Sequence, residues 1–242
     1  MEKNKKTDIL KIIYFIRLNW KYLISIPRSI YLNFRLLPLN QAIKVPIFFS
    51  NYTRVRICRN SRLIINSHEI HAGMIKIGYT HCDFFLARDY KSNIHLEAGI
   101  ILFNGYANIG AGCRISIKQN AKIEFGKQFW STGPILIIAR KSVLFENNCV
   151  LSWNITIMDH DAHDIYVDNT LINKSKPIVF KNHCWVGCNS TILKGAIIPR
   201  DGIIAANSVI TREHHMSNTI IAGAPGKEIC KNVCCKQSKI GS

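Results

Sequence analysis

The chain has 242 residues, and its 48% hydrophobic content excludes a generally disordered protein. Its 32 Lys and Arg against 15 Asp and Glu give a net charge of +17, which predicts affinity for a polyanion: an acidic membrane, an acidic glycan or a phosphate-rich cofactor. The sequence contains no helix-turn-helix, zinc-finger or aromatic-basic sheet pattern, so we expect no nucleic acid among its partners.

Residues 1–54 are predicted to form a basic, partly helical N-terminal extension. Lys11, Arg17 and Lys21 interrupt every apolar window long enough to span a bilayer, so we expect no transmembrane helix. No cleavable secretory signal follows either, and we expect a cytoplasmic protein. An amphipathic helix here has two open uses. It can lie peripherally on an anionic membrane, at the inner membrane face, or pack its apolar side on its own domain or a sister subunit.

A six-residue period then dominates the chain. Large apolar residues recur at this spacing, and small residues recur four places after them. The large set is Phe180, Val186, Ile192, Ile198, Ile204 and Ile210, and the small set is Cys184, Ser190, Ala196, Gly202 and Ser208. Neither a helix nor a simple strand has a period of six, so the segment is predicted to be a repeat array.

Less regular copies of the same repeat pattern extend back to Ile75. Most of them follow one another at intervals near eighteen residues, which is three repeats of six. Each repeat offers one short strand and one corner, and stacking on the next turn buries its apolar side. The prediction is an all-β fold, a parallel β-solenoid over residues 55–229, with the small residues and Gly78, Gly110, Gly126 and Gly187 at tight corners. Residues 230–242 are expected to form a basic, frayed tail.

One interval is much longer than the others. It predicts an extruded loop over residues 153–177, which contains His160 and His163 among several aspartates. Loops held on a rigid scaffold commonly carry chemistry.

The nine cysteines show no disulfide framework or zinc-ligand spacing. Cys113, Cys149 and Cys184 fall at equivalent inward repeat positions, so we expect them to pack in the core of a reduced protein. No bound metal is expected.

The chain resembles the hexapeptide-repeat acyltransferases of the left-handed β-helix fold, and more closely their maltose and polysaccharide O-acetyltransferase branch. The residues that carry this resemblance are Ser152–His163, Cys184–Gly187, Ile192–Gly195, Ile204–Thr211 and Ile221–Lys227. It implies a left-handed coil, a homotrimer with active sites between adjacent coils, and acetyl transfer from acetyl-CoA to a saccharide acceptor.

By this resemblance the catalytic base is His163, with His160 as the second candidate. A sugar hydroxyl needs a base with a pKa near 7 as it attacks a thioester, and histidine meets that need. A neighbouring carboxylate, Asp159, Asp161 or Asp164, is expected to orient the imidazole. An acyl-enzyme on Cys149 or Cys188 is the chemical alternative.

The resemblance also assigns binding residues. The cofactor positions fall on Trp185, Cys188, Ala205, Thr211, Arg212 and Lys227, where Arg212 and Lys227 would meet coenzyme A phosphates. The acceptor wall is predicted from Ser131, Thr132, Trp153 and Asn154. Thr132 and Ala139 replace an asparagine and an aspartate of maltose-type enzymes, which argues against a simple maltose-like acceptor.

The sequence therefore predicts an acetyl-CoA-dependent O-acetyltransferase acting on a sugar hydroxyl of a surface polysaccharide (capsule or O-antigen) or its precursor. Three alternatives stay open. One is an acetyltransferase of a small soluble acceptor such as an antibiotic, serine or simple sugar. Another is a zinc hydratase like γ-carbonic anhydrase, with His160, His163 and His183 as ligands. The last is a non-catalytic scaffold that binds an acidic partner.

Overall fold

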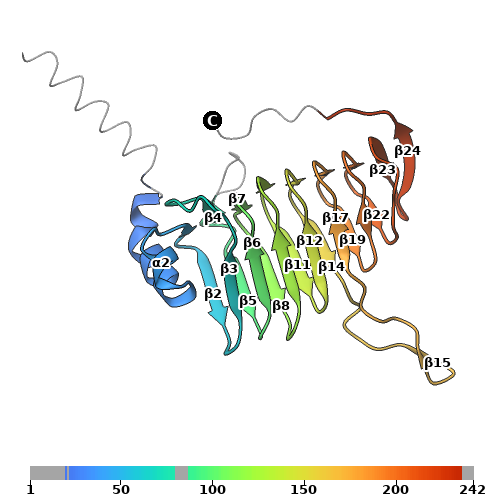
Figure 1. Ribbon diagram of the computed structural model, residues 1–242. Helices are drawn as coiled ribbons and strands as arrows, with labels where there is room; N and C mark the ends of the chain where they lie inside the picture. The colour runs from blue at the N-terminus through green and yellow to red at the C-terminus, as the bar shows by residue number, and fades with distance from the viewer. Residues whose placement is uncertain (1–19, 21, 80–86, 236–242) are drawn as a thin grey trace, which may run out of the picture.

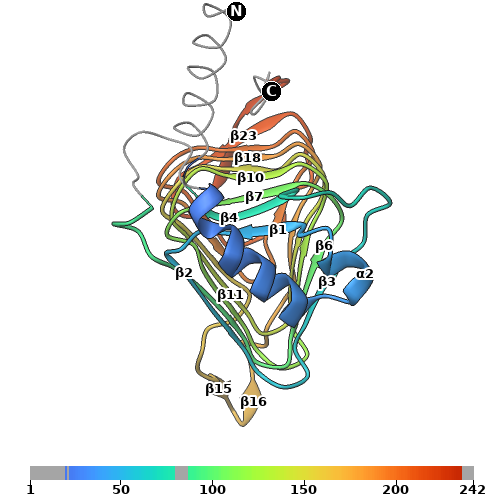
Figure 2. The same cartoon turned by 90° about the vertical axis from the view of Figure 1, so that its left-hand side faces the viewer.

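The computed structural model describes residues 20, 22–79 and 87–235, and it forms a coil of three parallel sheets (Figure 1). Seen along its axis the coil is a triangular prism, with one sheet on each side (Figure 2). Each turn passes through sheets A, B and C in that order, as in β10, β11 and β12, so each successive strand stacks on its counterpart one turn earlier. The predicted parallel β-helix is confirmed.

Each sheet is a ladder of short strands. Sheet A contains β1 (Ile47–Phe49), β4 (Ile75–Tyr79), β7 (Ala107–Gly110), β10 (Phe129–Ser131), β13 (Val150–Leu151), β18 (Trp185–Val186), β21 (Ile203–Ile204), β23 (Thr219–Ala222) and the antiparallel β24 (Lys227–Lys231). Sheet B contains β2 (Thr53–Ile57), β5 (Ser92–Leu96), β8 (Arg114–Ile117), β11 (Ile135–Ala139), β14 (Ile155–Met158), β19 (Thr191–Leu193) and β22 (Val209–Ile210). Sheet C contains β3 (Arg62–Ile65), β6 (Ile100–Phe103), β9 (Lys122–Phe125), β12 (Ser142–Phe145), β17 (Ile178–Phe180) and β20 (Ile197–Ile198).

The interior confirms the two six-residue series. All eleven of their members are buried, because the large side chains point inward along the strands and the small ones fit where the chain turns. In sheet C the register places four phenylalanines above one another. The ring centroids are 5.0 Å apart from Phe103 to Phe125, 5.3 Å from Phe125 to Phe145 and 4.5 Å from Phe145 to Phe180. This stack fills one side of the prism.

Two kinds of residue build the corners. Left-handed backbone recurs where sheet C passes into sheet A, at Asn148, His183 and Asp201, and polar residues of this kind tolerate a positive φ. At the same passage one turn before Asn148, a glycine lies against the next turn. A Cβ on Gly126 would sit 2.5 Å from the backbone carbon of Glu146, so no larger residue fits that corner.

The boundaries differ from the predicted ones at three places. The coil begins at Ile47, because β1 and β2 already pair with β4 and β5. The long loop begins after Met158, since β14 continues sheet B, and it carries a hairpin of β15 (Tyr166–Val167) and β16 (Thr170–Leu171). β24 extends to Lys231, inside the predicted tail. Residues 1–19 of the predicted extension and 236–242 of the tail lie outside the described residues.

A helix over residues 22–36 crosses the open end of the coil, followed by the short α2 (Leu39–Ala42) (Figure 2). Polar side chains attach the helix to the edge strand β1. The Asn33 amide accepts a hydrogen bond from Ile47 N at 3.1 Å and donates one to Ile47 O at 2.7 Å, and Ser29 Oγ accepts from Phe49 N at 3.0 Å. The helix thus satisfies backbone groups that an edge strand would otherwise expose. None of the described helices is long and apolar enough to cross a membrane.

Candidate active site

The predicted site residues divide between two corners of the prism. The loop with both histidines leaves the corner between sheets B and C, which we call the BC corner (Figure 1). The predicted acceptor residues lie at the corner between sheets A and B, the AB corner. Asn154 precedes β14 and His160 follows it, and six residues of extended chain span about 20 Å. One chain therefore does not bring the two groups together.

His160 is a buried anchor at the base of the loop. Its side chain is 5% exposed, and its Nδ1 lies 3.0 Å from Oδ1 of the fully buried Asp159. The Asp159 carboxylate also accepts hydrogen bonds from the backbone N–H groups of Arg140 at 2.8 Å and Lys141 at 2.7 Å. This carboxylate ties the loop to the preceding turn, and it serves His160 rather than His163.

His163 has the opposite character. It is exposed, and its imidazole has no hydrogen-bond partner among the residues that the structure describes. Its backbone is held firmly: its N–H donates to Asp161 O at 2.8 Å, and its carbonyl accepts from Asn173 Nδ2 at 2.7 Å. Ala162, directly before it, has a φ of 66°, which is a strained value for alanine. The histidine is thus positioned by its main chain, while its ring is free.

A side-chain cluster at Asp161 braces this arrangement. Its Oδ2 accepts hydrogen bonds from Lys194 Nζ and, at 3.0 Å, from Asn173 Nδ2. Lys194 also donates to Asn173 O at 3.0 Å. The hydrogen bond from Lys194, with help from Asn173, lowers the pKa of Asp161 below its usual value. The cluster connects the loop to the turn that follows β19.

Sequence reasoning did not find Lys194 and Asn173 as loop supports. Lys194 lies 33 residues from Asp161, and Asn173 lies in a polar run without a pattern. No local signal marks such contacts, because they depend on how far the loop folds back onto the coil.

Three of the four predicted acceptor residues are accessible at the AB corner. Asn154 is exposed, and Thr132 and Trp153 are half-buried. Asn154 Nδ2 donates to Asn189 Oδ1 at 3.2 Å, one turn further along. Ser131 requires a correction: its side chain is fully buried and accepts a hydrogen bond from Gly110 N at 2.9 Å. It stabilises the corner and cannot touch an acceptor.

The predicted cofactor residues also divide. Cys188 and Ala205 occupy the AB corner on successive turns, and Lys227 pairs with Ala222 at the end of the next strand in sheet A. Thr211 and Arg212 are exposed after β22, at the BC corner. Trp185, 39% exposed on sheet A, donates from Nε1 to Ser152 Oγ at 3.3 Å. Trp185, Cys188, Ala205 and Lys227 thus lie in strands of sheet A or just after them, whereas Thr211 and Arg212 lie at another corner.

The geometry does not support the zinc site, and it limits the acyl-enzyme alternative to Cys188, which is half-buried. His183 lies at the corner between sheets C and A, with Nδ1 2.6 Å from Asp201 Oδ1, so the three histidines of the proposed zinc site do not converge. In the described part of the chain no group of three or more His, Cys, Asp or Glu could hold a metal ion. Cys149 is fully buried, with its Sγ 3.5 Å from that of Cys184, so it is closed to an acyl group. Core packing of Cys113, Cys149 and Cys184 is confirmed.

Comparison with known proteins finds relatives that are named as acetyltransferases. No family model matches it. It is 32% identical over 110 residues to a polysialic acid O-acetyltransferase of Neisseria meningitidis, an alignment that covers 43% of this chain and 51% of that protein. It is 27% identical over 168 residues to a protein of Escherichia coli K12 that is named as a lipopolysaccharide-biosynthesis O-acetyltransferase, covering 65% of this chain and 83% of the other.

A solved structure has the same fold. The polySia-specific acetyltransferase NeuO superposes with a TM-score of 0.50 at 18% identity, covering 79% of this chain and 92% of that one. The fold is therefore the left-handed parallel β-helix. These findings confirm the resemblance drawn from the sequence, because the relatives that match are named as O-acetyltransferases. The relatives are named acetyltransferases, in agreement with the predicted enzyme class.

Proposed function

We propose that this protein is an O-acetyltransferase that moves an acetyl group from acetyl-CoA to a sugar hydroxyl of a surface polysaccharide or its precursor. The two relatives are named for acetylation of polysialic acid and for lipopolysaccharide biosynthesis, which supports a glycan acceptor. The single observation that carries the chemistry is His163, whose backbone is fixed on both sides while its imidazole is exposed and unpaired within the described residues.

In this mechanism His163 is the general base. It accepts the proton of the acceptor hydroxyl as the hydroxyl oxygen attacks the thioester carbonyl carbon. The carbon–sulfur bond then breaks, and the departing coenzyme A sulfur takes the proton from the imidazolium. His163 returns to its neutral form. Its fixed main chain supports this role, because a base works best when the fold holds it in place before substrate arrives.

The separation of the two corners leads to the second part of the proposal. In this arrangement His163 at the BC corner of one copy faces the AB corner of a neighbouring copy, which supplies Trp153, Asn154 and the predicted coenzyme A residues of that corner. A cyclic homotrimer gives each copy one such neighbour on either side, so it forms three equal sites. The exposure of the loop in a single chain supports this arrangement, because the partner would cover it.

The direct test is His163→Ala. We expect kcat to fall by about 10² to 10⁴, the usual contribution of a general base, with an unchanged melting temperature because the imidazole is exposed. The assay follows release of the coenzyme A thiol from acetyl-CoA with polysaccharide acceptors of bacterial surfaces, and mass spectrometry of the product locates the acetyl group.

His160→Ala is the matched control. It removes the ring that contacts the buried Asp159, so it should lower stability by about 1–3 kcal/mol while keeping chemistry in the folded fraction. A fully active His163→Ala enzyme would refute the role of His163. If His160→Ala were stable and inactive, the two histidines would have to exchange roles.

A further inference from the structure

The helix over residues 22–36 presents its large apolar side chains to solvent. Leu23 and Ile30, like Ile24 and Tyr31, are seven residues apart, which is two helical turns, and Trp20 and Phe34 are separated by twice that spacing, so all six share one face. Their exposed fractions are substantial: Trp20 57%, Leu23 41%, Ile24 55%, Ile30 39%, Tyr31 62% and Phe34 50%. Leu39 at 68% and Ile43 at 62% are also exposed, at the start of α2 and directly after it. We call these eight side chains the apolar end face.

The opposite side of the helix packs on the coil, with Leu32 and Leu36 against the core and several polar side chains beside them. Ser25, Ser29, Leu32 and Asn33 are buried there, and two of them bond to β1. The helix is therefore apolar on its solvent side as well, whereas a surface helix usually has a polar face toward solvent. A contiguous apolar surface of this size, left uncovered by its own domain, indicates an interaction site.

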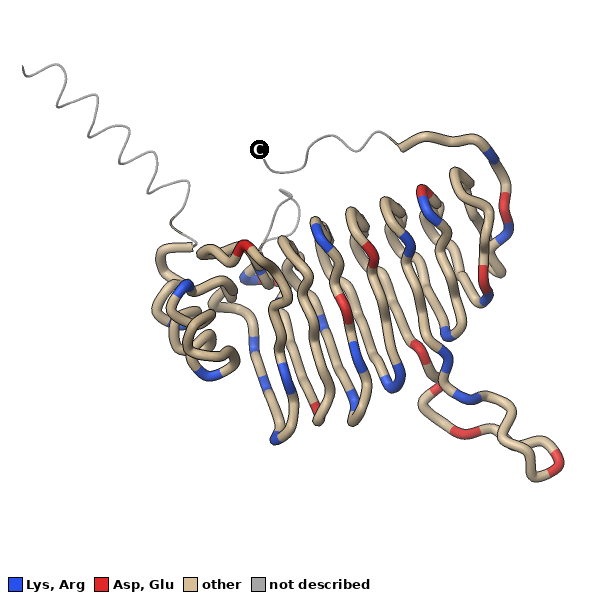
Figure 3. The backbone as a smooth tube through the Cα atoms, in the orientation of Figure 1, with Lys and Arg blue, Asp and Glu red and all other residues tan. Residues whose placement is uncertain are grey.

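Basic residues flank the apolar end face. Arg28 and Arg35 are seven residues apart and therefore lie along the same side of the helix, and Lys44 is exposed after α2. Figure 3 shows basic residues on the helix and on the first strands of sheet B. The apolar end face thus has cations along one of its margins.

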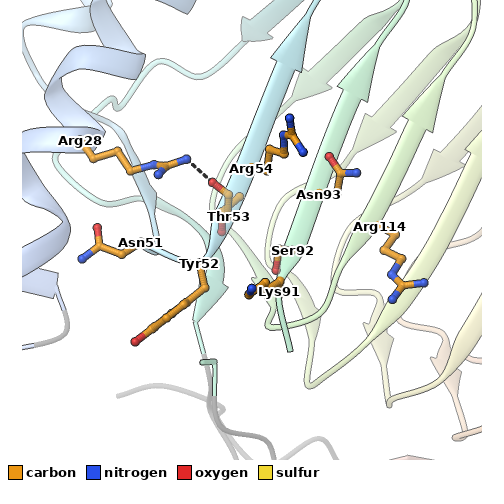
Figure 4. A pocket seen from close by; sticks show the side chains of 9 residues that line it. All are labelled: Arg28, Asn51, Tyr52, Thr53, Arg54, Lys91, Ser92, Asn93 and Arg114. Atoms are coloured by element: carbon orange, nitrogen blue, oxygen red, sulfur yellow. Dashed lines mark hydrogen bonds between the residues drawn. The ribbon is translucent and has the colours of Figure 1, made fainter. Parts of the chain in front are cut away.

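A basic cavity of about 600 Å³ adjoins this margin (Figure 4). Its lining includes Arg28 from the helix, Arg54 and Arg114 from β2 and β8, and Lys91, and it includes no acidic residue. The register places Asn93 between Arg54 and Arg114 on sheet B. Arg28 donates to Thr53 O, so the cavity joins the helix directly. Among the described residues, Arg54, Lys91 and Arg114 have no carboxylate partner. Four cations in one hollow create a local potential that favours anions.

We propose that this end of the coil binds a membrane surface of anionic phospholipids. The apolar end face enters the boundary between headgroups and acyl chains, and the cations of the cavity and of the helix margin contact lipid phosphates. Trp20 and Tyr31 suit this depth, because their rings are amphipathic. The inference goes beyond the proposed reaction and does not depend on it.

The length of the coil sets the distance between this surface and the candidate active site. Sheet B runs from β2 at this end to β14, where the His163 loop begins, in four strand-to-strand steps. At about 4.8 Å a step, the loop base stands about 19 Å from the first strand. The coil would hold the candidate active site above the membrane, within reach of the sugar part of a lipid-linked glycan.

Vesicle sedimentation of the full chain tests the proposal. The probes are vesicles of phosphatidylcholine alone and of phosphatidylcholine mixed with phosphatidylglycerol. We expect strong binding only to the anionic vesicles. The double variants Ile24→Gln/Phe34→Gln and Arg54→Gln/Arg114→Gln should each weaken it at least roughly tenfold.

Matched controls lie toward the far end of the coil. Ile229, 64% exposed on β24, serves as the apolar control in the variant Ile229→Gln. The double variant Arg200→Gln/Lys231→Gln removes the same number of charges as the arginine pair, away from the cavity. Both controls should bind anionic vesicles like the wild-type chain. All substituted residues are exposed, so circular dichroism should show unchanged folding.

Three results would overturn the proposal. Equal binding to neutral and anionic vesicles would exclude recognition of anionic lipid. Equal losses in the test and control variants would mean that net charge or hydrophobicity acts without a defined surface. The third result is a failure to bind vesicles. If the chain then associates end to end in ultracentrifugation and Ile24→Gln/Phe34→Gln abolishes this association, the apolar end face binds a second copy. If the chain instead binds a soluble anionic glycan and Arg54→Gln/Arg114→Gln loses that binding, the cavity binds a glycan.

Discussion

The regular coil and the loop of residues 159–177 differ in what their side chains do. In the coil, inward side chains such as Phe145 and Phe180 are fully buried and touch one another along the axis. In the loop, every residue from Asp161 to Thr170 is exposed, and shape depends on a few polar contacts such as Asp161 with Lys194. Stability therefore resides mainly in the coil and candidate chemistry in the loop, so substitutions should separate the two properties.

The largest effect on stability is expected in the phenylalanine stack. Phe145→Ala leaves a cavity between Phe125 and Phe180, and such truncations cost about 3–5 kcal/mol. Chemical denaturation measures the loss, and the folded fraction should keep its kcat. Phe145→Leu, which restores most of the volume, should recover much of the stability. A Phe145→Ala chain whose folded fraction has a lower kcat than the wild-type chain would contradict the separation of stability in the coil from chemistry in the loop.

Lys194→Met should have the reverse outcome. It removes the brace on Asp161, so the main chain at His163 loses its fixed position, and we expect kcat to fall about tenfold to a hundredfold. The melting temperature should barely change, because surface ion pairs contribute about 0–1 kcal/mol.

Lys181→Met is the control for this variant. It breaks a comparable pair in the coil, in which Lys181 Nζ lies 3.0 Å from Glu146 Oε1, and it should leave kcat unchanged. Equal losses of activity in the two variants would contradict a specific role for Lys194.

The smallest effect is a pH dependence of loop order. The pKa of Asp161 is lowered in the folded chain, mainly by the hydrogen bond from Lys194. A group with a depressed folded pKa stabilises the fold above its unfolded pKa, about 3.9 for aspartate, and loses that contribution as pH falls through the folded value. The loop should therefore stay ordered near neutral pH and loosen in acid, while the coil remains intact.

Hydrogen exchange across this acid range measures the effect at Ile165, whose N–H donates to Asn173 Oδ1 at 2.7 Å. Protection corrected for intrinsic exchange should fall in acid in the wild-type chain and stay constant in Lys194→Met. A pH-independent wild-type loop would show that Asp161 does not hold it.

The coil was predictable because its period repeats a local rule. Phe180 and Ile198 belong to the same six-residue series, and the burial of each depends only on equivalent residues in the neighbouring turns. His163 was selected through its motif, and it remains a prediction. The lack of any side-chain partner within the described residues agrees with an exposed catalytic ring but does not test it.

Contacts between residues that are far apart in the sequence could not be predicted from it. Ser131 was expected in the acceptor wall, yet corner geometry turns its hydroxyl inward to Gly110. The N-terminal helix shows the same limit. Its period of 3.6 shows which side chains share a face, but it does not reveal that the edge strand β1 binds the face that carries Ser29 and Asn33.

The central claim is that a complete site needs two copies of the chain, and active-site complementation tests it most directly. Two defective chains are coexpressed with different tags, His163→Ala at the BC corner and Trp153→Ala/Asn154→Ala at the AB corner, and mixed oligomers are purified. In a cyclic trimer that contains both variants, about a third of the sites join two intact halves, because the ring has one such junction among its three. The account predicts that mixed oligomers recover about that share of wild-type activity, whereas neither variant alone is active. Mixed oligomers that stay as inactive as their parents would show that each site lies within one chain.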